Sequence, residues 1–155
     1  MDEMYINLVV FRLAGERCAL PLSAVERIVR AVEVTPLPGA PSAVLGVIDV
    51  AGTLIPVFSL RRKFQLEDRD VGTDDQFVIA QTAQRRVAIV VDAALEVLAQ
   101  AAARISDPPA LLPNLVHVRG VARLDDGLVV IHNLEAFLTE EESRQLDEAL
   151  DRAGG

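Results

Sequence analysis

The stretch GVIDVAGTLIPVFSLRRKF, residues 46–64, returns in altered form as GVARLDDGLVVIHNLEAFL at residues 120–138. The two stretches align without a gap at an offset of 74 residues. Upstream, LVVFRLAGERCALPL at residues 8–22 aligns in the same way with FVIAQTAQRRVAIVV at residues 77–91, at an offset of 69. The chain therefore contains two copies of one supersecondary unit, which is too few for a solenoid.

Each copy has the pattern of strands joined by tight turns. Runs rich in Val, Ile and Leu flank Ala51-Gly52 and Asp126-Gly127, and Asp-Gly is among the strongest short-range signals for a β-hairpin. The run at residues 5–13 is apolar on both faces, which is typical of a strand buried on both sides. Each copy offers about five short strands, and a sheet that small loses its exposed edges by curling up. We therefore predict a mainly β protein of two small barrels packed side by side.

Two helices are expected within this β pattern. An S-x-x-E capping box begins at Ser23, and apolar residues then recur at helical spacing, which predicts a short helix over residues 23–30. A T-x-x-E box begins at Thr139 and predicts a C-terminal helix over residues 139–153. The apolar side chains of this second helix fall on one face, so we expect it to cover an apolar surface.

The middle of the chain carries a loop signal. EDRDVGTDD at residues 67–75, which we call the acidic loop, has the composition of a solvated connection. We therefore divide a single domain, residues 1–155, into a first subdomain over about 12–75 and a second over about 76–138, followed by the C-terminal helix. The pattern leaves open which subdomain pairs with the strand at residues 5–13.

The composition excludes several classes of protein. The formal net charge is −8, and nucleic-acid binding depends on clustered Lys and Arg that this chain lacks. No window approaches the ~20 apolar residues of a membrane span, and the acidic start, MDEMYINLVV, is unlike a secretory signal. We expect a cytoplasmic protein that neither binds nucleic acid nor inserts into a membrane. Cys18 is the only cysteine, so an intramolecular disulfide is excluded and a packed apolar role is favoured.

No set of residues forms a recognisable catalytic or metal site. His117 and His132 have no acidic residue at ligand spacing, which favours packed or rim histidines. Asp49 and Asp92 stand at strand ends and could form a carboxylate pair, although capping of turns or helix starts is the commoner role. Nucleophile elbows and phosphate-binding loops are missing from the sequence. We predict that the protein is not an enzyme and carries no metal or cofactor.

The remaining signal is apolar surface in excess of what two small barrels enclose. Part of it must be covered by the other barrel, by the C-terminal helix or by another molecule. This favours a protein scaffold, and the alternative that all of this surface is buried internally stays open. A runner-up from another class is a small-molecule-binding β-protein that holds its ligand between the barrels.

Four stretches of the sequence resemble the CheW family of bacterial chemotaxis adaptors, in order and across nearly the whole chain. They are VFRLAGERCALPLSAVERI, LPGAPSAVLGVIDVAGTLIPVFSLRRKF, RRVAIVVDAALEVL and RGVARLDDGLVVIHNLEAFL. The resemblance implies two SH3-like five-stranded barrels and no catalytic activity. It also implies an adaptor recruited to receptor arrays, which couples the cytoplasmic tips of chemoreceptors to the histidine kinase CheA, whose regulatory domain has the same fold. Other CheW-like domains are further candidate partners.

The same resemblance assigns partner contacts to positions of this chain. The receptor groove between the barrels would involve Val25, Arg27, Ile28, Gly46, Val47 and Ala51. The kinase-facing surface would involve Val34, Leu37 and Leu54. A second contact, which forms arrays, would fall near Leu111 on the other barrel.

Two positions depart from the family pattern. Where family members usually read N-L-R-G at the hairpin turn, this chain reads Asp49-Val50-Ala51-Gly52, so an alanine replaces an arginine expected to contact the receptor. Where they usually read V-x-E-I, Arg27 replaces the glutamate. The pair of opposite charges at the groove is therefore not reproduced. We expect either a divergent receptor set or accessory pathway, or a loss of receptor coupling with kinase binding retained.

Overall fold

The computed structural model describes residues 4–101, 104–106 and 118–154 of the chain. Its strands are β1 (Tyr5–Leu13), β2 (Glu16–Pro21), β3 (Val25–Arg30), β4 (Val44–Val50), β5 (Thr53–Phe58), β6 (Gln76–Gln81), β7 (Arg86–Val91), β8 (Ala93–Ala101), β9 (Ile105–Ser106), β10 (Val118–Leu124) and β11 (Gly127–His132). Its helices are α1 (Leu60–Lys63) and α2 (Glu140–Gly154), and its short 3-10 turns include η1 (Leu22–Ala24) and η4 (Leu134–Ala136). Among the described residues, no helix combines the length and the apolar character that crossing a membrane requires.

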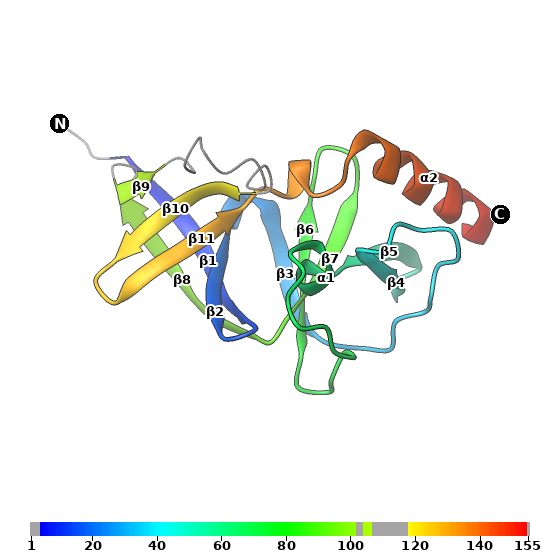
Figure 1. The fold of residues 1–155 in the computed structure, drawn as a ribbon, viewed down its shortest axis with the longest axis horizontal. Helices are drawn as coiled ribbons and strands as arrows, with labels where there is room; N and C mark the ends of the chain where they lie inside the picture. Colours follow the sequence, from blue (N-terminus) through cyan, green and yellow to red (C-terminus); the bar gives the residue numbers. More distant parts are fainter. Residues whose placement is uncertain (1–3, 102–103, 107–117, 155) are drawn as a thin grey trace.

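The strands form two curved sheets that pack side by side (Figure 1). Lobe A is the sheet with the order β8-β1-β2-β11-β10-β9, and lobe B is the sheet with the order β3-β6-β7-β5-β4. In lobe B, Thr35 forms an antiparallel bridge with Val47 of the outer strand β4, so the chain that leaves β3 closes the sheet on itself. The predicted pair of small β lobes is confirmed, with a sixth, two-residue strand in lobe A.

Each lobe combines strands from both sequence repeats. The first hairpin of the first repeat, β1-β2, lies in lobe A between β8 and β11 of the second repeat. The first hairpin of the second repeat, β6-β7, lies in lobe B between β3 and β5 of the first repeat. The boundary between the lobes therefore does not follow the expected division near residue 75, because the parallel pairings β2-β11 and β5-β7 exchange hairpins between the repeats.

The strand registers agree with the sequence repeat, including its irregularities. The β4-β5 ladder of lobe B skips Leu45, and the β10-β11 ladder of lobe A skips Arg119, which lies 74 residues further on. The β3-β6 ladder skips Glu26, and the β1-β8 ladder skips Leu95 at the other offset of 69. A bulge thus recurs at the same place in each lobe, so the duplication extends to backbone details that composition alone does not require.

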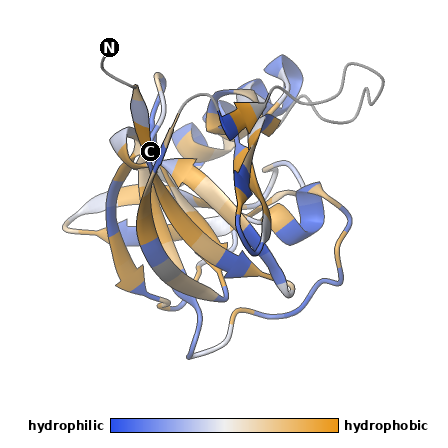
Figure 2. Cartoon of the chain, turned by 90° about the vertical axis from the view of Figure 1, so that its left-hand side faces the viewer, coloured by the Kyte–Doolittle hydropathy of each residue, from blue (hydrophilic) through white to orange (hydrophobic). Residues whose placement is uncertain are grey.

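Three clusters of buried apolar side chains hold the lobes together. The lobe A core comprises Leu8, Val10, Ala19, Ala122, Val129 and Ile131. The lobe B core comprises Ile48, Ile55, Val57, Phe77, Ile79 and Ala88. The inter-lobe core, between the sheets and under α2, includes Phe11, Leu20, Val78, Ile89, Phe137 and Leu146. Because β1 and β6 supply residues to a lobe core and to the inter-lobe core, apolar segments run along the strands (Figure 2), and much of the excess apolar surface is buried internally.

The helix predicted over residues 23–30 is wrong. One 3-10 turn, η1, forms there without a side-chain cap, and strand β3 follows it. The bulge at Glu26 places Val25 and Ile28 on the same face of β3, because their ladder partners on β6 both face the inter-lobe core. This i, i+3 relation on a bulged strand imitates helical spacing, while the β-branched residues favour the strand. The short helix in the first half of the chain is α1 instead.

Helix α2 begins as predicted and covers an apolar surface. The Oγ1 atom of Thr139 accepts a hydrogen bond from the N–H of Glu142 at 3.1 Å, and the Glu142 carboxylate accepts one from the N–H of Thr139 at 3.0 Å. Buried Leu146 fixes the apolar face of α2 on the inter-lobe core beside lobe B (Figure 1). Nearby, the stacked rings of Phe58 and Phe137 have centroids 4.5 Å apart, which ties β5 to the segment that precedes α2.

Candidate functional site

The receptor-facing residues predicted on β3 lie at one edge of lobe B. Val25 is half-buried against the inter-lobe core, and Ile28, on the same face, is 36% exposed. Arg27 is exposed, while its neighbour Glu26 pairs with Arg86. The hydrogen bond from Arg86 lowers the pKa of Glu26 and keeps this pair ionised. The edge of β3 therefore offers an apolar side chain and a cation to a partner.

The receptor-facing residues predicted on β4, Gly46 and Val47, are buried. Val47 exchanges two backbone hydrogen bonds with Thr35, at 2.8 and 2.9 Å. Gly46 has a φ angle of +154°, and a Cβ atom there would lie 2.1 Å from the carbonyl oxygen of Thr35. Glycine is therefore required where lobe B closes, and these two residues shape the backbone there without presenting a side chain to solvent.

Ala51 lies in the exposed turn between β4 and β5. Its φ angle is +51°, a left-handed conformation that is uncommon for a residue with a side chain, and Gly52 follows at +88°. The Asp49 carboxylate accepts a hydrogen bond from the N–H of Gly52 at 2.8 Å, so Asp49 caps this turn. The turn therefore presents a methyl group at residue 51, on a backbone fixed by its neighbours.

The predicted receptor groove mixes surface residues with residues that support the surface. Arg27, Ile28 and Ala51 are exposed, and they come from β3 and from the end of β4, the two outer strands in the lobe B order. Val25 and Val47 pack into or against the inter-lobe core instead. Direct contact with a partner is therefore open to the first three.

The residues predicted to face the kinase also differ in exposure. Leu54 of β5 is 41% exposed beside the β4-β5 turn and is available to a partner. Val34 is half-buried against the lobe B core, and Leu37 belongs to the inter-lobe core at 8% exposure. Leu54 is therefore the main surface anchor of the three. Leu111, predicted for the second contact, and His117 lie outside the described residues.

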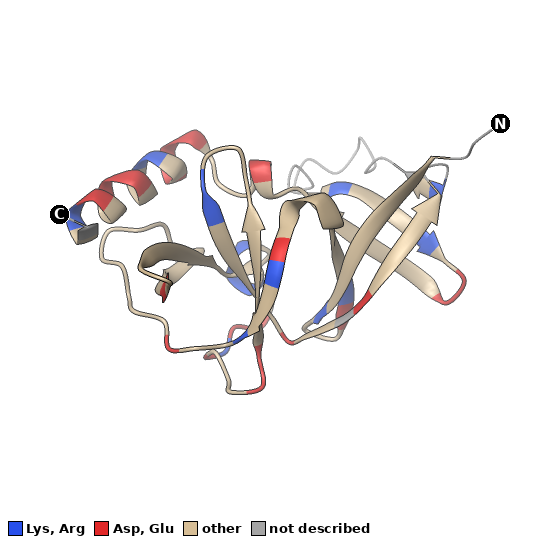
Figure 3. Cartoon of the chain, turned by 180° about the vertical axis from the view of Figure 1, so that it is seen from behind, with Lys and Arg blue, Asp and Glu red and all other residues tan. Residues whose placement is uncertain are grey.

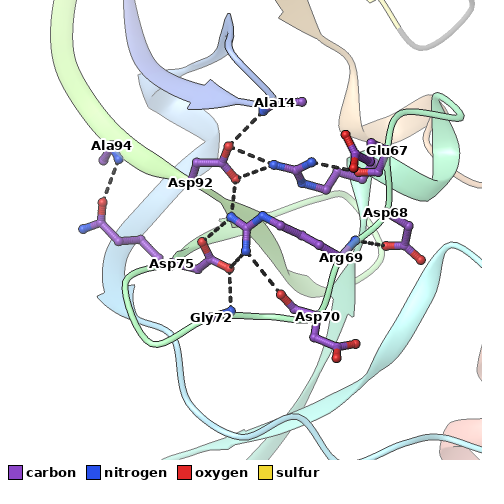
Figure 4. A network of polar contacts seen from close by, with 11 residues as sticks. Ala14, Glu67, Asp68, Arg69, Asp70, Gly72, Asp75, Asp92 and Ala94 are labelled. Carbon is purple, nitrogen blue, oxygen red and sulfur yellow. Dashed lines mark hydrogen bonds and ion pairs between the residues drawn. The ribbon is translucent and has the colours of Figure 1, made fainter.

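A charged network that sequence reasoning missed joins the lobes (Figure 4). Arg61 of α1 and Arg69 of the acidic loop both donate to Asp92, which links β7 to β8, at 2.9 Å. The Asp92 carboxylate also accepts a hydrogen bond from the N–H of Ala14, in the β1-β2 turn, at 2.9 Å. Arg69 pairs further with the buried carboxylate of Asp75 at 2.7 Å. The acidic loop is thus fixed to both lobes. The sequence signals that could have predicted this network are Arg61, before the loop, and Arg69, within it.

This network gives Asp92 a structural role. Burial, the largest influence, raises the pKa of Asp92, but hydrogen bonds from Arg61 and Ala14 and the charges of Arg61 and Arg69 outweigh it and lower the pKa below its ordinary value of 3.8. Asp92 is therefore an ionised partner of two arginines at neutral pH. Because Asp49 instead caps its own turn, the two carboxylates do not share partners as an acid/base pair would.

His132 and Cys18, the remaining residues that could act in catalysis or metal binding, are buried in the protein. The ring of buried His132 packs near those of Phe11 and Phe64, with centroid distances of 6.5 and 5.0 Å. Burial, assisted by the charge of Glu16, raises the pKa of the Cys18 thiol to about 12, so the thiol stays protonated. Within the described ranges, no group of three or more His, Cys, Asp or Glu side chains is placed to hold a metal ion.

The space between the lobes is filled by the inter-lobe core, so the alternative of a small molecule held there is not supported. Two grooves of the described surface lie at its periphery. One runs between the β6-β7 turn and the start of α2. Another runs between residues 31–34 and residues 71–73.

The fold and its paired hairpins match a known family. The model of the CheW-like domain matches residues 7–142, and the chain belongs to this family. The chemotaxis protein CheW of Treponema pallidum (strain Nichols) is 24% identical over 151 residues, which cover 94% of this chain and 88% of that protein. The chemotaxis protein CheW of Klebsiella aerogenes is 26% identical over 143 residues, which cover 91% and 86%.

A solved structure has the same architecture. The crystal structure of the scaffolding protein TtCheW from Thermoanaerobacter tengcongensis matches with a TM-score of 0.81 and 28% identity, and the match covers 91% of this chain and 92% of that one. The resemblance inferred from sequence motifs is therefore confirmed for the family and the fold. The individual partner contacts stay predictions.

Proposed function

We propose that this protein is a non-catalytic adaptor that couples the cytoplasmic tips of chemoreceptors to the histidine kinase CheA. The observation that carries the proposal is the match, over 91% of the chain, to a solved scaffolding protein of the same family. The physical character of the molecule supports it, because two rigid lobes with apolar side chains at exposed strand ends are suited to holding other proteins.

The kinase-facing surface is proposed to centre on Leu54. This side chain is exposed at the end of a hairpin whose opposite strand is anchored in the lobe B core, so a partner meets a preorganised apolar contact. Val34 contributes its exposed part, while buried Leu37 supports the segment from below. The regulatory domain of the kinase, with the same fold by resemblance, would pack lobe against lobe.

Substitution at Leu54 tests the kinase surface. Leu54→Glu should weaken binding to the kinase's regulatory domain by several-fold to a hundred-fold, about 1–3 kcal/mol, because a charge replaces an exposed apolar anchor that the complex would bury. Leu128 is the matched control, since it occupies the equivalent position in the second repeat and is 62% exposed. Isothermal titration calorimetry on folded variants checks both. Equal losses for Leu54→Glu and Leu128→Glu, or no loss for either, would place the kinase surface elsewhere.

Receptor coupling is proposed to involve Arg27, Ile28 and Ala51. Arg27 and Ile28 give β3 a positive charge on one face and an apolar side chain on the other, so a receptor helix lying along this strand edge could meet them with an acidic and an apolar residue. We further propose that this groove has been rebuilt for a divergent receptor set or an accessory pathway. A pull-down with the organism's own receptor tips tests this. Ordinary receptor affinity, unchanged by Ala51→Arg, would contradict the rebuilt groove, and kinase binding without receptor binding would show that receptor coupling has been lost.

A further inference from the structure

We propose that the groove between residues 31–34 and residues 71–73 binds an extended segment of a partner protein in which apolar residues alternate with Lys or Arg. The groove lies where the chain leaving β3 passes the acidic loop, at the lower edge of lobe B in Figure 1. We call it the strand groove. Its only residue in common with the proposed kinase-facing set is Val34, and the proposal does not depend on kinase or receptor binding.

The walls of the strand groove are apolar. Val32 is 54% exposed, one of the largest exposed fractions among the apolar side chains of lobe B. Val34 and Val71, on opposite walls, are half-buried and pack against the lobe B core, which holds both walls in place. Gly72 and Thr73 complete the second wall with little bulk. Side chains of a bound strand would therefore find aliphatic contacts on both sides.

The first wall also has an open backbone edge. Its two ends are anchored, because the N–H of Ala31 donates to the carbonyl of Asp75 at 3.0 Å and Thr35 is bridged to β4. Between these anchors the chain makes no turn or helix, and no hydrogen bond within the described residues uses the backbone of residues 32–34. Neighbouring residues of an extended chain direct their N–H and C=O groups to opposite sides. Since Thr35 is paired with β4 and the described residues leave the backbone groups of residues 32–34 unused, these groups are available to another strand.

The negative charge around the strand groove favours a partner segment with positive charge. Glu33 lines the groove, and Asp70 and Asp74 flank its second wall. All three are exposed, and none enters an ion pair among the described residues, while the neighbouring cations are Arg30 and Arg69, of which Arg69 is already paired with Asp75 and Asp92. Acidic residues are visible in both loops at the lower edge of Figure 3. The excess negative charge attracts a cationic segment and repels a second copy of this chain, whose net charge is −8.

A designed peptide tests the proposal without knowledge of the natural partner. The probe is a fluorescein-labelled peptide of alternating Val and Lys or Arg, with an alternating Val and Glu peptide as its charge control. We expect the cationic peptide to raise fluorescence polarisation at low salt, the acidic peptide not to do so, and binding to fall steeply as salt is raised. A version of the cationic peptide with N-methyl groups on alternate residues should lose binding, because it cannot pair with a backbone edge.

Two protein variants assign the binding to this groove. Val32→Lys should weaken binding of the cationic peptide on the order of ten-fold or more, because it removes an apolar contact and adds a like charge. Val97→Lys is the matched control, since Val97 lies on lobe A, is 59% exposed and gains the same charge, and it should bind the peptide like the unmodified protein. Amide signals of residues 32–34 should shift in 15N-1H NMR spectra when the cationic peptide is added.

Three outcomes would overturn the proposal. Equal weakening by Val32→Lys and Val97→Lys would mean that the peptide responds to overall charge. Shifts confined to amides outside lobe B would mean that it binds elsewhere. Concentration-dependent shifts of residues 32–34 without any peptide would assign the groove to a second copy of the chain. Neither kinase binding nor the Leu54→Glu variant enters these readouts, so failure here is distinguishable from failure of the proposed adaptor function.

Discussion

Lobe A and lobe B have equivalent backbones but different surfaces. Leu54 of lobe B and Leu128 of lobe A occupy the same position in the repeat, and both are exposed at the start of a strand. The residues paired with them across the hairpins differ, since Leu54 faces Asp49 and Leu128 faces Arg123. The duplication has therefore kept bulges, ladders and core positions, while the charge beside an exposed leucine has changed sign. The two lobes therefore present different chemistry at equivalent positions even though the scaffold is shared.

The aromatic pairs at the lobe margins allow the sharpest comparison. In lobe B, Phe58 and Phe137 stack at 4.5 Å with an interplanar angle of 7°, and in lobe A the equivalent of Phe58 is His132, which contacts Phe64 at 5.0 Å and 35°. Phe137 is fully buried and helps to hold α2, whereas Phe64 is only partly buried. The lobe B pair should therefore contribute more to stability.

Truncation of these rings has the largest expected effect. Phe137→Ala should lower the free energy of unfolding by about 3–5 kcal/mol, because it leaves a cavity under α2. Phe64→Ala should cost about 1–2 kcal/mol, since part of that ring is already in contact with solvent. Urea denaturation followed by circular dichroism measures both. Equal costs would show that the two margins are energetically equivalent despite their different residues.

The closure of lobe B gives the second comparison. Gly46→Ala should lower the free energy of unfolding by about 2–4 kcal/mol, because the new methyl group meets the carbonyl of Thr35 at a backbone conformation that favours glycine. Gly52→Ala, in the neighbouring turn, has a positive φ angle but open space around it, so it should cost about 1 kcal/mol. Similar costs for the two variants would mean that the bridge to Thr35 yields easily and that lobe B is not held closed there.

The network between the lobes gives the third and smallest effect. Asp92→Asn should cost about 1–3 kcal/mol at pH 7, because Arg61 and Arg69 lose their shared anion in a partly buried site. The native pKa of Asp92 is lowered, so its stabilising contribution is fully present above the ordinary pKa of 3.8 and is lost progressively as the pH falls from that value through the lowered native pKa. The difference between the parent protein and the variant should therefore shrink in acid.

Denaturation curves at pH 7 and near pH 3 measure this convergence. The control is Asp49→Asn, because Asp49 caps an exposed turn within one lobe and an amide oxygen can accept the same hydrogen bond. It should change stability by less than about 0.5 kcal/mol at either pH. A cost for Asp92→Asn that persists unchanged in acid would show that packing, and not charge, holds the lobes at this point.

Local sequence patterns predict most of the elements of the fold. Hairpins and helix caps depend on residues that are close together in the sequence. The structure contains both the predicted hairpin that turns at Ala51-Gly52 and the predicted capping box at Thr139. The sequence of strand β3 wrongly predicts a helix, because a bulge gives this strand helical spacing. The exchange of hairpins could not be read locally, since the pairing of Cys18 with Val130 joins strands distant in sequence.

The candidate site was harder to predict for a different reason. An apolar residue in a strand signals burial and partner contact equally well, so Val47 and Leu37 could not be told apart from Leu54 before their exposure was known. The Asp92 network likewise depends on four segments that meet only in the folded protein, namely the β1-β2 turn, α1, the acidic loop and the link between β7 and β8. Sequence indicated which segments form the surface, and tertiary packing decided which of their side chains reach it.

The exchanged hairpins bear on the origin of the molecule. A half-length ancestral chain carrying one repeat would hold the strands of one whole lobe, but in this protein each lobe takes its inner hairpin from one repeat and its outer strands from the other. Two such ancestral chains would complete both sheets by swapping hairpins across a two-fold axis. The present chain thus has the topology of a domain-swapped homodimer fused into one polypeptide, with the acidic loop as the fusion joint.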